Sequence, residues 1–137
     1  MDKIKITFVK SNISAIAELY SDKCPENISS LLKTLPTTVK AFHAKWGGNE
    51  IWSVIDNFEN YKPENETFLP SIGEILLVPQ KSGACFDIWY DRGWAFGPNG
   101  FVQGSALGKI AENLPQFAKE ASKLSTEGAQ LIKIEKV

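Results

Sequence analysis

The segment FHAKWGGNEIWSVI, residues 42–55, carries the pattern that decides the fold. Apolar and polar residues alternate on both sides of the pair Gly47-Gly48, which predicts two β-strands joined by a tight turn. The segment also holds the single histidine of the chain, two of its four tryptophans and one carboxylate. We therefore expect a hairpin here that displays chemically useful side chains.

The length of the turn decides which side chains share a face of this hairpin. A two-residue turn at Gly47-Gly48 places Lys45 opposite Glu50, which would make them an exposed ion pair. A turn that also includes Asn49 shifts the register by one residue, and such a shift sends every side chain to the opposite face. One face then displays Ala44, Trp46, Glu50 and Trp52. The sequence leaves both registers open, and we interpret the second as one wall of a binding cleft.

Composition is typical of one globular domain over residues 1–137, with 43% hydrophobic and 23% charged residues. Fifteen basic and sixteen acidic residues give a net charge of −1, and Arg92 is the one arginine. Nucleic-acid binding favours a basic face rich in arginine, so we expect no nucleic-acid partner.

The N-terminal sequence MDKIKITFVK alternates charged and apolar residues and lacks the apolar core of a signal peptide. No apolar run approaches the roughly 20 residues that span a bilayer, so we expect no membrane partner. Cys24 and Cys85 are too few for a disulfide framework and show no metal-ligand spacing. We expect buried thiols in a cytoplasmic protein, with no metal and no cofactor.

Eight strands and two helices are predicted from the periodicity of the chain. The strands are expected at residues 3–9, 13–20, 39–46, 50–55, 73–78, 85–90, 105–112 and 129–136. One helix should begin at Pro25 and stop before Pro36, and another should begin after Asn113 as its N-cap and end near Gly128. Strands with mostly short connections predict a mostly β fold, a closed antiparallel barrel with two capping helices.

Three features interrupt this pattern. Gly108 lies inside a predicted strand, which is typical of a bulge or a close approach of backbones. Asp87 interrupts the apolar strand at residues 85–90, so its side chain either faces solvent or has a buried partner. Residues 56–70 form a polar, proline-containing connection of a length that is usually functional or mobile, although a plain surface loop is the alternative.

Several stretches, in this order, resemble the cyclophilin family. The family's strand and first capping helix are similar to AELYSDKCPENISSLLKTLP, residues 17–36. Its Phe-His-Arg strand falls at FHAKW, residues 42–46, and its late strand and second helix resemble ALGKIAENLPQFAKEASKL, residues 106–124. The resemblance covers most of the chain as separate short matches. It implies a cyclophilin-like barrel.

A closer resemblance is to small bacterial cyclophilin-like proteins that form a domain of unknown function. They are similar in the pattern His-x-x-Trp-x-x-x-Glu-Ile-Trp, here residues 43–52. They are also similar in the pattern Gly-Pro-x-Gly-Phe-Val, here residues 97–102. This resemblance implies a fold and no particular chemistry.

The strongest candidate for chemistry is Glu50 between Trp46 and Trp52. An apolar setting would raise the pKa of its carboxyl and suit it to proton transfer. His43 is a second catalytic candidate, although a lone strand histidine is more often structural. Trp46 and Trp52 are predicted to bind a flat or apolar ligand, since strand residues near a tight turn lie toward a rim.

Two more aromatic residues, Tyr90 and Phe101, are predicted to approach the same cleft as ligand-binding residues.

These candidates lead to two hypotheses of different class. The first is a small organic ligand bound in the cleft, with Glu50 as the acid or base of any reaction. The second is an assembly module, in which the aromatic rim contacts another protein or a second copy of the chain.

Prolyl isomerase activity is a function that the fold resemblance suggests and the residues oppose. Cyclophilin isomerases carry an arginine after the histidine of that strand, whereas Ala44 stands here and has no side-chain donor. They continue with a Gln-Gly-Gly segment, whereas this chain has Trp52-Ser53-Val54.

We predict that the protein does not accelerate cis–trans isomerisation of an Ala-Pro or Gly-Pro peptide, which takes roughly tens to hundreds of seconds uncatalysed. Ala44→Arg should gain little, because Trp52 would still obstruct the peptide. A protease-coupled peptide assay checks both statements. Isomerisation well above the uncatalysed rate would show that these departures do not matter.

Overall fold

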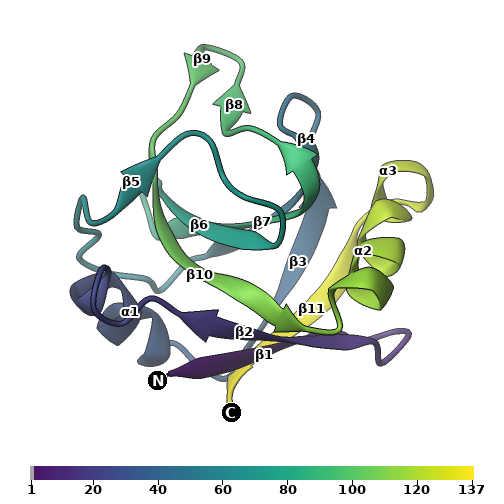
Figure 1. Cartoon of the computed structure of the whole chain (residues 1–137), viewed down its shortest axis with the longest axis horizontal. Coiled ribbons are helices and arrows are strands. Elements are labelled where there is room, and N and C mark those ends of the chain that lie inside the picture. Colours follow the sequence, from purple (N-terminus) through teal and green to yellow (C-terminus); the bar gives the residue numbers. More distant parts are fainter. Residues whose placement is uncertain (1) are drawn as a thin grey trace.

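Eight antiparallel strands close into a barrel in the computed structural model, which describes residues 2–137 (Figure 1). Around the barrel the order is β2-β1-β11-β3-β4-β7-β6-β10, and β10 pairs again with β2. The bounds are β1 Lys3–Phe8, β2 Ser14–Leu19, β3 Thr37–His43, β4 Gly48–Ile55, β6 Glu74–Pro79, β7 Ala84–Gly93, β10 Gly104–Glu112 and β11 Gln130–Lys136. The predicted mostly β fold class is confirmed.

Two helices pack against the barrel, as predicted. They are α1 (Pro25–Leu32) and α2 (Leu114–Ser122), and Figure 1 shows them on different sides of the barrel. The second helix is shorter than predicted, because the Lys123 amide bonds the Glu120 carbonyl three residues earlier and tightens the chain there. One further turn follows as α3 (Leu124–Glu127). None of the helices in residues 2–137 is both long and apolar enough to cross a membrane.

The barrel interior holds the main hydrophobic core, and alternation along each strand explains its membership. Ile132 and Ile134, which alternate with polar residues along β11, are fully or almost fully buried. From α2 and α3, the residues that complete the same core are Phe117, Ala121 and Leu124. Because these side chains fill the barrel, the interior is a packed core.

Gly108 has the role that its place in the sequence predicted. The pairing of β10 with β6 shifts register between Ala106 and Gly108. A Cβ atom at Gly108 would collide with the carbonyl oxygen of Glu18 in β2. Glycine therefore lets β10 approach β2 closely enough to close the barrel.

Asn113 differs from its prediction as a side-chain cap. It occupies the N-cap position of α2 with a left-handed φ of 67°, but its side chain makes no capping hydrogen bond among the described residues. Its Nδ2 instead donates to the Ser14 carbonyl at 2.7 Å. A left-handed φ is outside the usual N-cap conformation, so the amide bonds the start of β2 instead.

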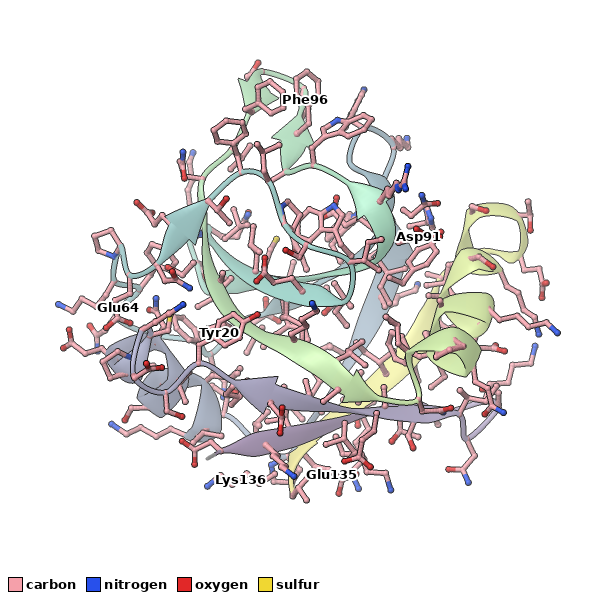
Figure 2. All side chains as sticks on the ribbon, viewed as in Figure 1. Tyr20, Glu64, Asp91, Phe96, Glu135 and Lys136 are labelled. Atoms are coloured by element: carbon pink, nitrogen blue, oxygen red, sulfur yellow. The ribbon has the colours of Figure 1, made fainter. Side chains whose placement is uncertain are left out.

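The long connection at residues 56–70 is fastened to α1. The Glu64 carboxylate accepts from the Asn27 amide at 2.9 Å and the Glu26 amide at 3.1 Å. These amides belong to the helix N-terminus, where a negative charge is favourable. The Asn27 side chain in turn bonds the Lys62 backbone through both its carbonyl and its amide group. Figure 2 shows Glu64 beside this helix.

Three short strands complete the fold. Within the 56–70 connection, β5 (Glu66–Thr67) pairs with β10. After β7, the strands β8 (Phe96–Gly97) and β9 (Gly100–Phe101) pair with each other outside the barrel sheet. Figure 1 shows β8 and β9 projecting at the end of the barrel where the turn between β3 and β4 also lies.

Candidate functional site

The hairpin of β3 and β4 adopts the register in which Asn49 belongs to the turn. Phe42 lies opposite Trp52, and the Ala44 amide donates to the Glu50 carbonyl at 2.9 Å. Ile51 points into the barrel core. Because neighbours along a strand face opposite sides, Glu50 and Trp52 lie on the outer surface of the barrel wall.

A cavity of about 520 Å³ lies on this outer surface. The strands β3, β4, β6 and β7 form its floor, and the segment that carries β8 closes one side. The residues that line it are Phe42, His43, Ala44, Lys45, Trp46, Glu50, Trp52, Val78, Gln80, Cys85, Asp87, Ala95, Phe96, Gly97, Pro98 and Val102. Most of these side chains are apolar, and the buried polar exceptions are two acids.

Glu50 is held at the floor of the cavity with only 6% of its surface exposed. Its carboxyl lies against Gly47, where a Cβ atom would collide with the Glu50 Oε1 atom. The carbonyl of Gly47 accepts from Trp89 Nε1 and from the Trp94 amide, both at 3.0 Å. A glycine and two hydrogen bonds thus fix the turn close over this acid.

Asp87 is the second acid, and only 8% of its surface is exposed. It lies opposite Trp52 in the pairing of β4 with β7, while Glu50 lies opposite Trp89. The two carboxyls therefore come from adjacent strands on the same face, and they form a hydrogen bond with each other. The sequence left open whether Asp87 faced solvent or a partner, and the partner is Glu50.

Burial and proximity raise the pKa of both carboxyls. Desolvation raises the pKa of Glu50, and the charge of Asp87 and the hydrogen bond between them raise it further. Desolvation also raises the pKa of Asp87, whereas the hydrogen bond from Glu50 opposes that rise. Two acids this close do not both ionise readily near neutral pH, so the pair keeps a proton.

This arrangement is chemically competent in two ways. A neutral carboxyl beside a carboxylate supplies a proton donor and a proton acceptor at the same place. In addition, both acids line the cavity, so the pair can hydrogen-bond the polar part of a bound molecule.

Aromatic side chains form the walls above the acids. Phe42 stacks on Trp52 with ring centroids 4.8 Å apart. Trp46 and Phe96 also line the cavity, and they are 50% and 36% exposed. Figure 2 shows Phe96 at the end of the molecule formed by β8 and β9. Flat apolar groups therefore surround a small polar floor.

His43 is held by hydrogen bonds at both ring nitrogens. Nδ1 lies 2.8 Å from the Ala44 carbonyl, and Nε2 lies 2.8 Å from the Tyr90 hydroxyl. Because a carbonyl only accepts, Nδ1 donates to the Ala44 carbonyl, and Nε2 shares a hydrogen bond with the Tyr90 hydroxyl. Both nitrogens are thus engaged in fixing the edge of the hairpin.

The predicted site residues divide into two groups. The structure brings together Trp46, Glu50, Trp52 and His43 around one cavity. Tyr90 and Phe101 are not in the cavity lining of the described chain. Tyr90 belongs to the barrel core, and its hydroxyl bonds His43 Nε2 at 2.8 Å and Asn49 Oδ1 at 3.4 Å. Phe101 is 61% exposed and packs against Phe68 and Phe96.

Sequence reasoning missed most of the cavity lining, including Asp87, which was not among the predicted site residues. Phe42 and Phe96 carried no signal, because their place depends on the hairpin register and on the path of the β8 segment. Cys85 was predicted to be a buried thiol, and it is buried in the cavity wall. Burial raises the pKa of its thiol to about 12, with the charges of Asp87 and Glu50 adding to the effect. The thiol therefore stays protonated and is a poor nucleophile at neutral pH.

Comparison with protein families places the chain in one of them. A model of the DUF3830 family, described as a protein of unknown function, matches residues 6–136. The chain belongs to the DUF3830 family. Within residues 2–137 of this DUF3830 protein, no group of three or more His, Cys, Asp or Glu side chains is placed to hold a metal ion. Among curated proteins, no sequence matches it.

Solved structures with the same fold are known. McbB in complex with tryptophan has a TM-score of 0.71 at 17% identity, over 96% of the DUF3830 chain and 44% of McbB. The DUF3830 chain thus spans less than half of the length of McbB. A hypothetical protein of Archaeoglobus fulgidus has a TM-score of 0.62 at 14% identity, over 99% of this chain and 95% of its own.

A cyclophilin-type peptidyl-prolyl cis-trans isomerase of Cryptosporidium parvum is also similar, with a TM-score of 0.60 at 14% identity. The similarity covers 100% of this chain and 98% of the isomerase. Identities this low establish a shared fold. The predicted resemblance to cyclophilins and to a domain of unknown function is confirmed.

The acid pair predicts an unusual dependence of stability on pH. A carboxyl with a raised pKa keeps its proton in the folded state at a pH where the unfolded chain has lost it. The free energy of unfolding therefore falls as pH rises above the unfolded pKa, by about 1.4 kcal/mol per pH unit for each retained proton. The fall ends once pH passes the folded pKa.

Glu50→Gln should remove part of this loss, since its amide keeps the hydrogen bond to Asp87 without a titrating proton. Between about pH 5 and about pH 8 we expect the variant to gain stability relative to the natural protein. Urea unfolding at several pH values checks this, with Glu112→Gln on the exposed end of β10 as the control. Parallel stability curves for Glu50→Gln and the natural protein would contradict the prediction.

Proposed function

We propose that this protein binds a small organic molecule in the outer cavity. The aromatic wall of Phe42, Trp46 and Trp52 would hold a flat apolar part of the ligand, and the acid pair of Glu50 and Asp87 would hold its polar part. The cavity volume of about 520 Å³ lies within the range of small-molecule sites, roughly 300 to 1,000 Å³. Such sites are mostly apolar with few polar groups, as this one is.

The observation that carries the proposal is the pair of buried acids in the wall of an apolar cavity. Removing two carboxyls from water and holding them together is costly, and it raises the pKa of both. A barrel does not need such a pair for its own stability, since the main hydrophobic core lies on the other side of the wall. A ligand that hydrogen-bonds the pair would lower that cost.

The comparison with McbB supports this proposal. McbB has a similar fold, and it was solved in complex with tryptophan. Tryptophan combines a flat apolar ring with polar groups, the combination that the present cavity would accommodate. We propose that the present cavity binds a ligand of this kind.

Within the proposed site, Glu50 is the residue suited to transfer a proton to or from the ligand. Its carboxyl is buried, protonated near neutral pH and adjacent to a carboxylate that can accept a proton. His43 lines the same cavity, but its two nitrogens are bonded to Ala44 and Tyr90. We therefore assign His43 a positioning role for the hairpin edge.

A screen by thermal shift tests the proposal, using small amines, acids, amides and heterocycles. A compound present at about 100 times its dissociation constant adds about 2.7 kcal/mol to the stability of the protein. We expect hits with the natural protein that weaken by about tenfold or more in Trp52→Ala, because Trp52 is part of the wall. Trp94→Ala is the matched control, since Trp94 is exposed and is not a lining residue. Hits that bind Trp52→Ala and the natural protein equally would place the ligand elsewhere.

A second candidate function is assembly, and the exposed aromatic residues beside the cavity favour it. Phe101 contacts Phe68 and Phe96 with ring centroids 4.9 and 5.0 Å apart. Trp46 and Trp94 are also substantially exposed. Exposed apolar patches often mark interaction surfaces.

Assembly predicts a stable dimer in sedimentation velocity, in which Trp46 and Trp94 are shielded from acrylamide quenching. Phe101→Ser should then return the protein to a monomer. A monomer at high concentration with freely quenched tryptophans would remove this candidate and leave the cavity as the proposed site.

A further inference from the structure

We infer that the ligand of the outer cavity carries a cationic nitrogen, an amine or amidine, attached to a flat apolar body. This inference rests on the proposed function, because it names the class of ligand for the same cavity. The polar floor, the aromatic wall and the distribution of charged groups each point to a cation.

The polar floor offers acceptors to a ligand. Both carboxyls line the cavity, and the proton that the pair retains lies in the hydrogen bond between them. While the pair is singly ionised, its remaining carboxyl oxygens can only accept hydrogen bonds. A ligand with an N–H donor therefore complements the pair, whereas a ligand with only acceptors would find no donor there.

The charge at this floor favours a cation over an anion. The pair that keeps one proton carries one negative charge in an apolar cavity, where electrostatic interactions are stronger than in water. An ammonium or amidinium group would form a charge-assisted hydrogen bond to Asp87. A ligand carboxylate would bring a further negative group beside two acids, which is unfavourable.

The aromatic wall favours a cation as well. Phe42 and Trp52 stack next to the acids, and Trp46 and Phe96 line the same space. The faces of aromatic rings attract cations, and tryptophan does so most strongly. The same faces bind the flat apolar part of a ligand. An amine on an aromatic body satisfies both demands at once.

The other titratable groups around the acids do not reverse this preference. His43 of β3 is bonded at both nitrogens, and the Cys85 thiol of β7 stays protonated near neutral pH. Lys45 in the turn is the formal cation of the lining, and its side chain is exposed. The lining residues from β6 and from the segment around β8 are uncharged at Val78, Gln80, Ala95, Phe96, Gly97, Pro98 and Val102.

Three indoles that differ in one group test the inference by calorimetric titration. Tryptamine carries an ammonium group, tryptophol carries a hydroxyl in its place, and indole-3-propionate carries a carboxylate. Near neutral pH we expect tryptamine to bind about tenfold tighter than tryptophol, as a charge-assisted hydrogen bond predicts. Indole-3-propionate should bind the weakest of the three.

Two variants locate the preference. Asp87→Asn should reduce the advantage of tryptamine over tryptophol to about twofold or less, because the charge at the floor is lost. Glu112→Gln, at the exposed end of β10 and outside the cavity lining, should retain the full advantage.

The pH dependence of the natural protein gives a readout that needs no variant, should Asp87→Asn fail to fold. The affinity for tryptamine should rise between about pH 5 and about pH 8, because binding releases a proton from the acid pair to solvent. The affinity for tryptophol should stay nearly constant over the same range.

Equal binding of tryptamine and tryptophol, or tightest binding of indole-3-propionate, would overturn the inference while the proposed function stands. Ligands found in the broader screen that need Trp52 but carry no cationic nitrogen would do the same. Binding by none of the indoles, together with no Trp52-dependent compound in that screen, would contradict the proposed function itself.

Discussion

The burial of two carboxyls on the outside of a β-barrel is the constraint on which the rest of the site depends. Glu50 and Asp87 lie on adjacent strands with less than a tenth of their surfaces exposed. Two charges in an apolar pocket would cost several kcal/mol each, so the pair lowers the cost by keeping a proton between them. The surrounding structure holds this pair in the wall of a mostly apolar cavity.

The cover over the acids is built from the backbone as much as from side chains. Gly47 has no Cβ, which lets the turn approach the Glu50 carboxyl, and its carbonyl receives hydrogen bonds from Trp89 and Trp94. Ala95 and the β8 segment then close one side of the cavity. Below the strands, the barrel core supplies stability independently. The fold can therefore tolerate a buried acid pair on its outer wall.

The fold was largely predictable from the sequence, because it depends on periodicity and on glycine and proline positions. The alternation of polar and apolar residues in β1 and β11 predicted these strands. Gly108 in β10 predicted the close approach of backbones at which the barrel closes. The left-handed conformation of Asn113 was not predictable, since the same residue type serves as a cap in other helices. The small strands β8 and β9 lie in a glycine-rich segment whose path is set by tertiary contacts with the barrel.

The site was predictable only in part, because it depends on register and on contacts between distant strands. Residues 42–55 identified Trp46, Glu50 and Trp52, but two registers fitted the sequence equally well. Asp87 stood out as an acid in an apolar strand, yet only the pairing of β4 with β7 brings it to Glu50. Phe101 was grouped with the cleft by its neighbours in the sequence, whereas its ring packs on Phe68 and Phe96.

The central claim is that Glu50 and Asp87 keep a proton between them near neutral pH. Carbon-13 NMR of the side-chain carboxyls, in protein labelled at Asp and Glu, measures this directly. The account predicts one Glu carboxyl carbon with the chemical shift of the protonated form at about pH 7, absent in Glu50→Gln, and an Asp carbon that titrates well above the ordinary pKa of about 3.9. Titration of every Asp and Glu carboxyl between about pH 3 and about pH 5 would contradict it.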